Sequence, residues 1–258
     1  MGKERVHRFV SKDLTVRIAA VNATEVVQHM QDLQNTFPLA TVGVGRGMVG
    51  ALLLASHLKD GQQVGLLFRG NGPLSSIYAE ASYEGHVRGY TPNPQYQPEN
   101  YDDGLSLRKA LGIGLLTVAR HQPFQKQPFQ GTVEMVSSEI GDDIAHYLHQ
   151  SHQIRSLVSL GVYLDKNGKV QSAGGVLIEV MPGVEESMVE KIIANYESPC
   201  TKARVMRALE AMGEDELQDM INKKEEVHVT CQVCGKPYSV SVDEVQELKN
   251  HIHRESMN

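Results

Sequence analysis

The three cysteines of the chain lie in its last quarter, where their spacing suits metal binding or thiol redox chemistry. Cys231 and Cys234 form a C-x-x-C pair that is followed by Gly235. Two thiolates on one tight turn can bind Zn²⁺, with Zn–S distances of about 2.3 Å, or can close a disulfide. Cys200 lies far enough upstream to return as a further ligand. Cysteines that serve only to fill a core are the less favoured interpretation.

Three thiolates do not complete the tetrahedral coordination that structural zinc prefers. The fourth ligand could be His228, Glu197 or a water molecule, or the position could stay empty. Ser198 is a poor ligand because its hydroxyl group remains protonated at neutral pH. For His228 the favoured interpretation is a strand residue that points outward, so its role as a ligand is the alternative.

A second pattern, Gly45-Arg46-Gly47-Met48-Val49-Gly50, matches the G-x-G-x-x-G motif of dinucleotide-binding proteins. That motif requires a strand before it and a parallel strand–helix–strand unit around it. The preceding residues 37–42 make a poor strand, and the following strands have an antiparallel character. We therefore interpret these glycines as small residues that allow close helix packing.

Three histidines, His146, His149 and His152, recur on a helix predicted over residues 138–151. No carboxylate pair completes a metal site there, because Asp142 and Asp143 are better explained as charges that favour a helix N-terminus. A solvated helix face is the favoured interpretation. Since the G-x-S-x-G, P-loop and H-E-x-x-H motifs are also missing, we do not expect an enzyme.

The first 180 residues predict an α+β domain. A strand over residues 14–21 precedes two helices, the second strongly apolar, and an antiparallel meander follows. More strands and the histidine-bearing helix complete a large antiparallel-sheet domain with packed helices, assigned to residues 1–180. The expected helices cover residues 25–33, 48–58 and 138–151, and the later strands cover 64–69, 74–81, 86–90, 115–120, 131–136, 157–164 and 170–180.

The remaining sequence predicts a short helical connector over residues 181–199 and a small module over residues 200–258. The module should contain two short helices, at 203–212 and 214–221, and a hairpin at 227–242 whose turn carries the C-x-x-C pair. A tail of this size obtains no more than about 3–5 kcal/mol from its own core. A bound metal or a disulfide is therefore expected to stabilise it.

Composition narrows the class of protein. The formal charge of −6, without a cluster of Lys and Arg, argues against nucleic-acid binding. The N-terminus does not resemble a secretion signal, and the longest apolar run, Ala51–Ala55, is too short to cross a membrane. A cytoplasmic protein without membrane contact is expected, and in that reducing compartment a C-x-x-C pair indicates metal binding or redox activity.

Several segments, in the same order, resemble the redox-regulated heat shock protein 33 family of chaperones. The resemblance covers nearly the whole chain and includes both predicted domains. The segments that carry it are Gly70–Leu74, Gly85–Tyr90, Gly131–Glu134, Asp142–Ala145, Ser151–Gln153, Ala173–Gly175 and the C-x-x-C pair.

The resemblance implies an ATP-independent holdase that binds unfolding client proteins, with a homodimer as a candidate active form. In the family, a C-x-C pair and a C-x-x-C pair bind zinc and keep the chaperone inactive. Oxidation to disulfides expels zinc, unfolds the module and the linker, and exposes apolar surface. Structural zinc contributes about 10–16 kcal/mol in zinc-finger peptides, so its loss should unfold such a module.

This chain departs from the family pattern at two places. It reads Ser198-Pro199-Cys200 where the family has C-x-C, so only Cys231 and Cys234 can form a disulfide between close neighbours. The connector between Gly175 and Cys200 is also shorter than usual. We hypothesise weaker zinc binding, a partly uncoupled switch or constitutive activity, unless Ser198 is an engineered replacement.

Two other classes of function remain as alternatives. A constitutive zinc ribbon that binds nucleic acid or a protein partner would show salt-dependent binding to RNA or DNA. A thiol oxidoreductase would use Cys231 and Cys234 to exchange disulfides, but the strand–helix–strand context of that class is missing.

Overall fold

The protein is represented by a computed structural model, and its chain divides into two compact units, Met1–Val184 and Glu185–Asn258. The predicted helical connector, residues 181–199, lies almost wholly outside the described part of the chain. The structure describes residues 5–98, 106–123, 125, 127–181, 183–184, 202, 205–206, 209, 214–223, 226–230 and 237–255.

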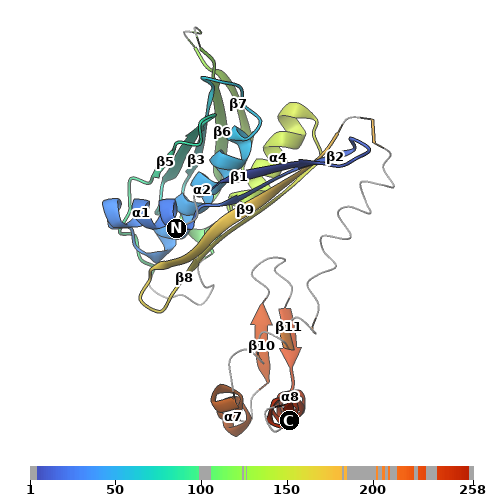
Figure 1. The fold of residues 1–258 in the computed structure, drawn as a ribbon. Helices are drawn as coiled ribbons and strands as arrows, with labels where there is room; N and C mark the ends of the chain where they lie inside the picture. Colours follow the sequence, from blue (N-terminus) through green and yellow to red (C-terminus); the bar gives the residue numbers. More distant parts are fainter. Residues whose placement is uncertain are drawn as a thin grey trace. The chain divides into compact units, whose positions relative to one another are not determined.

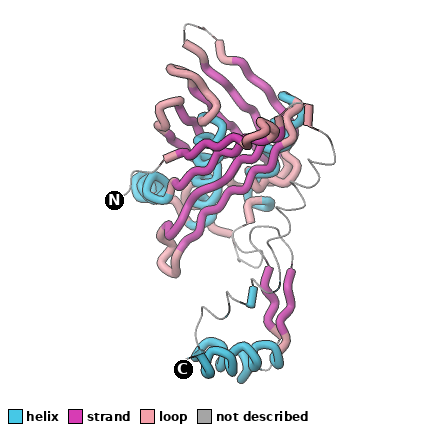
Figure 2. The backbone as a smooth tube through the Cα atoms, turned by 45° about the vertical axis from the view of Figure 1, so that its right-hand side comes forward, coloured by secondary structure: helices cyan, strands magenta, loops and turns pink. Residues whose placement is uncertain are grey.

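Unit 1 contains two antiparallel sheets, as the α+β prediction requires (Figures 1 and 2). The first has the strand order β1-β2-β9-β8 and the second the order β5-β4-β3-β6-β7. The meander expected at residues 64–90 is confirmed as β3, β4 and β5. The strands are β1 (Val6–Val10), β2 (Val16–Asn22), β3 (Gln63–Gly70), β4 (Ser76–Ser82), β5 (Val87–Tyr90), β6 (Gly114–His121), β7 (Phe129–Glu134), β8 (Ser156–Leu164) and β9 (Val170–Val180).

One long helix, α2 (Pro38–Ala55), contacts strands of both sheets and forms the centre of unit 1. It is long and apolar enough to cross a membrane by length and composition, but 89% of that stretch is buried inside the protein. The helix begins ten residues before the predicted start at Met48. Its first half is rich in Gly, Thr and Val, which have low helix propensity, and packing on both sides overrides that preference.

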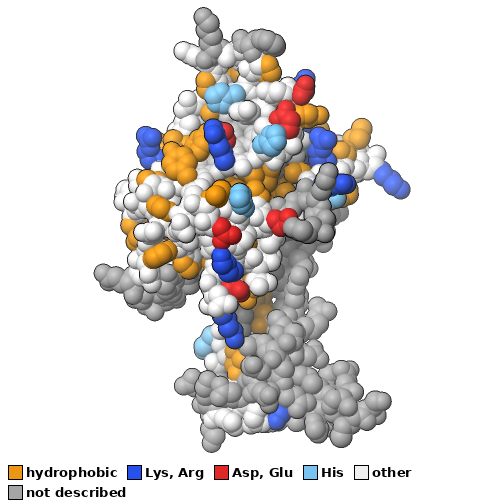
Figure 3. Space-filling view, turned by 60° about the vertical axis from the view of Figure 1, so that its left-hand side comes forward, with side chains coloured by type: hydrophobic (Ala, Val, Ile, Leu, Met, Phe, Trp, Pro, Cys, Tyr) orange, Lys and Arg blue, Asp and Glu red, His pale blue; other side chains and the backbone are white. Residues whose placement is uncertain are grey.

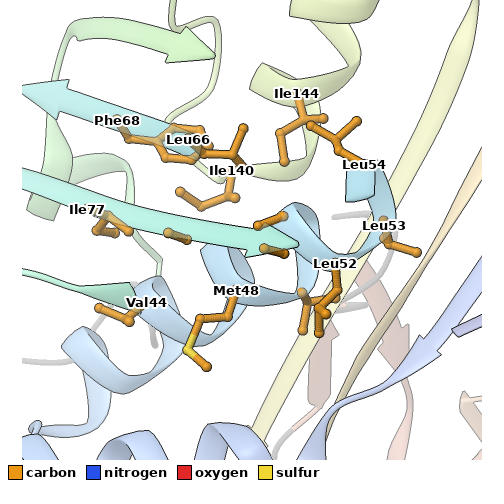
Figure 4. Packing of buried hydrophobic residues seen from close by; sticks show 14 of the residues in the cluster. Val44, Met48, Leu52, Leu53, Leu54, Leu66, Phe68, Ile77, Ile140 and Ile144 are labelled. Atoms are coloured by element: carbon orange, nitrogen blue, oxygen red, sulfur yellow. The ribbon is translucent and has the colours of Figure 1, made fainter. Parts of the chain in front are cut away.

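The glycines of α2 confirm the packing interpretation of the G-x-G-x-x-G motif, which lies in the middle of this helix. A Cβ atom on Gly45 would come within 2.8 Å of Val27 Cγ1, and one on Gly50 within 2.5 Å of Ile144 Cδ1. Larger side chains at these positions would push neighbouring elements apart. Figure 4 shows the result, with apolar side chains of α2 close to those of β3, β4 and α4.

The other helices of unit 1 cover the two sheets. Helix α1 (Thr24–Gln34) packs on β9, and α4 (Gly141–His152) packs on β8 and β7, whereas α3 (Arg108–Leu111) is a single turn. Strand β1 was not predicted. Four of its five residues are exposed, so it lacks a clear apolar alternation, and its pairing with β2 defines it instead.

Unit 2 contains α7 (Glu214–Lys223), the hairpin β10 (Val227–Thr230) and β11 (Pro237–Val240), and α8 (Val242–Glu255). The hairpin and the second short helix were predicted, but α8 was not. A capping box marks its start, because the backbone N–H of Ser241 donates to Glu244 Oε2 at 2.9 Å and the N–H of Glu244 faces Ser241 Oγ at 3.3 Å.

Candidate functional site

The two strands of the hairpin in unit 2 flank the C-x-x-C pair in the sequence. Val227 pairs with Val240 and Thr230 pairs with Pro237, so residues 231–236 connect the two strands. Cys231 therefore follows β10 directly, and Cys234 belongs to the same connection. Both cysteines lie outside the described residues, together with Cys200, Ser198 and Glu197, and the metal and disulfide roles assigned to them stay predictions.

His228, the candidate fourth ligand, is an exposed residue of β10. It is paired with Ser239 across the hairpin, and its Nδ1 lies 2.9 Å from Ser239 Oγ. Its neighbour Val227 faces the other way, toward the core of unit 2. This orientation agrees with the favoured interpretation of His228 as a strand residue that points outward.

Apolar side chains of the described residues form a core cluster in unit 2. The residues that the structure describes in unit 2 include four buried apolar side chains, with Leu217 and Val240 fully inaccessible. An ion pair of 2.7 Å between Lys202 Nζ and Glu244 ties the segment that follows Cys200 to the start of α8. The hydrogen bond from Lys202 holds the pKa of Glu244 below its ordinary value. The buried residues are Leu209, Leu217, Val240 and Val245.

No group of three or more His, Cys, Asp or Glu side chains is arranged to hold a metal within the described ranges. On α4, His149 and His152 are exposed, as the solvated-face interpretation expects, and His146 is half-buried. Burial and the positive charge of Arg120 lower the pKa of His152. Its ring packs edge-on against Tyr147, with 5.5 Å between the centroids, so these histidines belong to the helix surface and its packing.

Asp143 is more than a helix N-terminal charge. It is fully buried, and its carboxylate accepts hydrogen bonds from the backbone N–H groups of four residues at distances of 2.7–3.3 Å. Two of the residues that it holds have positive φ angles, +64° at Ser138 and +74° at Ile140. A β-branched residue is strained there, so Asp143 fixes a loop that would not otherwise keep this shape. The four donors are Val136, Ser137, Ser138 and Ile140.

Asp143→Ala is expected to lower the free energy of unfolding of unit 1 by about 2–3 kcal/mol, because buried N–H groups lose their acceptor. Asp142→Ala is the matched control. Asp142 is exposed in the same helical turn, and its loss should cost less than about 1 kcal/mol. Urea denaturation of both variants measures the difference, and equal effects would contradict this role of Asp143.

A buried ionic cluster lies where β9 ends. Glu179 is 2% exposed and pairs with Arg17, at 2.6 Å from Nε and 2.9 Å from Nη2, while His57 Nε2 lies 2.7 Å from its carboxylate. Burial alone would raise the pKa of Glu179, but hydrogen bonds and charge from His57 and Arg17 outweigh it and hold the pKa below its ordinary value. The cluster joins β2, β9 and the turn that follows α2, and sequence inspection did not single it out.

The outer face of the second sheet carries a tyrosine with a perturbed pKa. Tyr78 donates a hydrogen bond to Glu80, which also pairs with Arg88 at 2.6 Å. The Tyr78 ring lies 5.6 Å from that of Tyr90. Burial, followed by the hydrogen bond to Glu80 and its charge, raises the pKa of Tyr78 to about 12.

Tyr78 is expected to ionise late, near its pKa of about 12, and this late absorbance change should disappear in Tyr78→Phe. Because its pKa is raised in the folded state, its stabilising effect is complete below the unfolded value of 10.0 and is lost as the pH rises toward about 12. Glu80→Gln should move the late step to lower pH. An unchanged late step in Glu80→Gln would show that burial alone sets this pKa.

Comparisons with known proteins agree with the resemblance seen in the sequence. The model of the Hsp33 protein family matches residues 4–199 and 188–241. A 33 kDa chaperonin of Syntrophotalea carbinolica is 33% identical over 286 residues, which cover 95% of this chain and 99% of that protein. A 33 kDa chaperonin of Geobacter sulfurreducens is 32% identical, with 95% and 94% covered.

Among solved structures, the crystal structure of the 33 kDa chaperonin (heat shock protein 33 homolog) of Thermotoga maritima superposes with a TM-score of 0.71. The two sequences are 28% identical, and the alignment covers 96% of this chain and 98% of the other. Sequence and fold therefore match from end to end, across both units. This chain belongs to the Hsp33 family.

Proposed function

We propose that the protein is an ATP-independent holdase chaperone, which binds unfolding proteins and prevents their aggregation under heat or oxidative stress. The observation that carries this proposal is the match to 33 kDa chaperonins over nearly the full length of both partners. In this scheme residues 1–180 form the chaperone core, 181–199 the linker and 200–258 the module that senses oxidants. The protein would act by binding clients and not by catalysis.

The zinc site of the proposal uses Cys200, Cys231 and Cys234, and His228, Glu197 or a water molecule is the candidate for the fourth position. The donor set fits zinc because thiolates and imidazole are its common ligands. The hairpin register supports the pairing of Cys231 with Cys234, since one short connection contains both. A module of this size obtains little stability from its own core, which supports a structural role for the metal; when bound, the metal would fix the module in its folded state.

Oxidation would then join Cys231 and Cys234 in a disulfide and release zinc. Each disulfide requires the loss of two electrons to an oxidant such as peroxide. Ser198 removes one family thiol, so we propose that zinc is bound less tightly and that the switch is weaker than with two complete cysteine pairs. A fraction of the protein would be active before oxidation.

The described surface of unit 1 offers apolar side chains that could contact clients. Ile113 is 82% exposed and Val136 is 56% exposed. The Met135 N–H donates a hydrogen bond to the Gly114 carbonyl at 2.9 Å. This bond continues the pairing of β6 with β7 and places Val136 next to Ile113. Leu115, 47% exposed, adjoins them on the same face. On the face shown in Figure 3 apolar side chains lie among charged ones, which suits weak, unspecific binding of unfolding chains.

The test is a light-scattering assay of thermal aggregation of an unrelated enzyme, without ATP, using the reduced protein and the peroxide-treated protein. Suppression by the reduced protein and stronger suppression after oxidation are expected. No suppression in either state would overturn the proposal. Salt-dependent binding to RNA or DNA, measured on the same samples, would instead favour a zinc ribbon.

A further inference from the structure

A groove with a volume of about 700 Å³ opens in unit 1 at the edge of the first sheet. Its walls come from β1, β2, the first turn of α1, the last turn of α2, and residues 82–87 around the β4–β5 turn. This volume lies within the range of about 300–1,000 Å³ that is usual for sites of small molecules. The function proposed above makes no use of this groove.

The groove is lined by both polar and apolar groups, and its apolar floor consists of side chains from several elements. Val6 of β1 pairs with Val21 of β2, and both belong to the lining. Leu52 is 6% exposed and Ala55 is 3% exposed, and they form the wall that α2 contributes. Val87 of β5 also lines the groove. An alkyl chain placed here would exchange contact with water for contact with these side chains.

The rim of the groove carries an excess of positive charge. Arg5, Arg8 and Glu84 are exposed lining residues. The two arginines carry two positive charges and Glu84 carries one negative charge. With His86 counted as neutral, the net charge of the rim is +1. Neither arginine forms an ion pair with a carboxylate of the described residues. Arg8 Nη1 donates to the Ser56 carbonyl at 3.0 Å, which uses one of the five N–H donors of a guanidinium group.

We propose that the groove binds an amphipathic monocarboxylate, such as a fatty-acid anion, with its alkyl chain on the apolar floor and its carboxylate at Arg5 and Arg8. A guanidinium group matches a carboxylate with two parallel hydrogen bonds. The single excess positive charge complements one negative charge, and Glu84 disfavours more highly charged ligands. The apolar lining selects the alkyl chain.

A tryptophan reporter tests this site, because the chain contains no natural Trp. Tyr83→Trp places the reporter on the groove wall, where Tyr83 is 45% exposed. Tyr163→Trp is the matched control, since Tyr163 is a 66% exposed residue of β8 that does not line the groove. Titration with decanoate below its micellar concentration should give a saturable fluorescence change with one-to-one stoichiometry for Tyr83→Trp only.

The charge requirement is tested in the Tyr83→Trp background. Arg5→Gln with Arg8→Gln should weaken decanoate binding by about tenfold or more, since charged hydrogen bonds are lost. Arg5→Lys with Arg8→Lys should have a smaller effect, because the positive charges remain. Arg69→Gln, which changes an exposed arginine of β3 outside the groove lining, should leave binding unchanged. Circular dichroism and thermal unfolding establish that each variant is folded.

Several outcomes would overturn the proposal. Decanoate could fail to bind, bind as well to the Arg5→Gln and Arg8→Gln variant, or bind no better than decanol. Sedimentation gives a further arm. If the protein is a dimer and Arg8→Gln dissociates it, the groove is a contact surface between two copies of the chain. It would then not be a site for a carboxylate ligand.

Discussion

Cys231→Ser is expected to abolish zinc binding and to unfold unit 2, while unit 1 stays folded. Structural zinc contributes about 10–16 kcal/mol in zinc-finger peptides. A module of this size obtains only about 3–5 kcal/mol from its own core. Loss of the metal should therefore unfold it, so the variant should act as a holdase without oxidation.

The measurement is thermal unfolding followed by circular dichroism, read beside the zinc content. The transition of unit 2 should disappear from the Cys231→Ser variant, and that of unit 1 should remain. Asn222→Ala is the control, because it changes an exposed residue of α7 in the same unit without removing a thiol. A Cys231→Ser variant that keeps both zinc and the transition of unit 2 would contradict the metal site.

Ser198→Cys should strengthen the switch. A fourth thiolate completes a Cys₄ site of the common structural kind, so zinc affinity should rise and the reduced variant should lose residual holdase activity. Competition with a chromogenic chelator measures the affinity. Asn222→Cys adds a thiol at an exposed position of α7 in unit 2 and serves as the control. Equal zinc affinity in the natural protein and Ser198→Cys would show that a ligand other than a cysteine already fills the fourth position.

Glu179→Ala is expected to destabilise unit 1 by about 3–5 kcal/mol, because it leaves Arg17 and His57 without the buried carboxylate that they share. Asp32→Ala is the matched control. It also removes an acidic partner, but Asp32 and Lys169 are more than half exposed, and such pairs contribute about 0–1 kcal/mol. Urea denaturation at neutral pH measures the free energy of unfolding of both variants. Similar losses in Glu179→Ala and Asp32→Ala would contradict the importance of the cluster.

The same carboxylate gives a pH dependence with a definite sign. Since the pKa of Glu179 is lower in the folded than in the unfolded protein, its stabilising effect is complete above the unfolded value of 4.5 and is lost as the pH falls below it. The free energy of unfolding should therefore fall less steeply with acidification in Glu179→Gln than in the natural protein.

The antiparallel meander and the hairpin of unit 2 could be predicted because their turns and apolar alternation are local. The start of α2 could not be predicted, since residues 38–47 form a helix only by packing between two sheets, and most strands of those sheets come later in the sequence. Strand β1 carries too few buried residues to show an alternation, and its pairing with distant β2 residues decides its structure. The Ser241-x-x-Glu244 signal of α8 was present in the sequence and was overlooked.

Some residues of the candidate sites could likewise be predicted from the sequence, and others could not. The cysteines were found from residue type and spacing alone, whereas the buried cluster at Glu179 needs three segments that are far apart in the sequence. One local signal existed. Glu179 occupies an inward position of β9, two residues after the fully buried Leu177, and an acidic residue at such a position requires a partner. Which partner it has depends on the fold.

The most direct test of a chaperone controlled by a zinc–thiol module is the zinc content of the whole protein, measured by atomic spectrometry before and after peroxide treatment, with the aggregation assay on the same samples. We predict about one zinc per chain in the reduced protein, its release on oxidation, and stronger suppression of aggregation after release. Zinc that stays bound after oxidation, or activity that does not change when zinc leaves, would contradict the account.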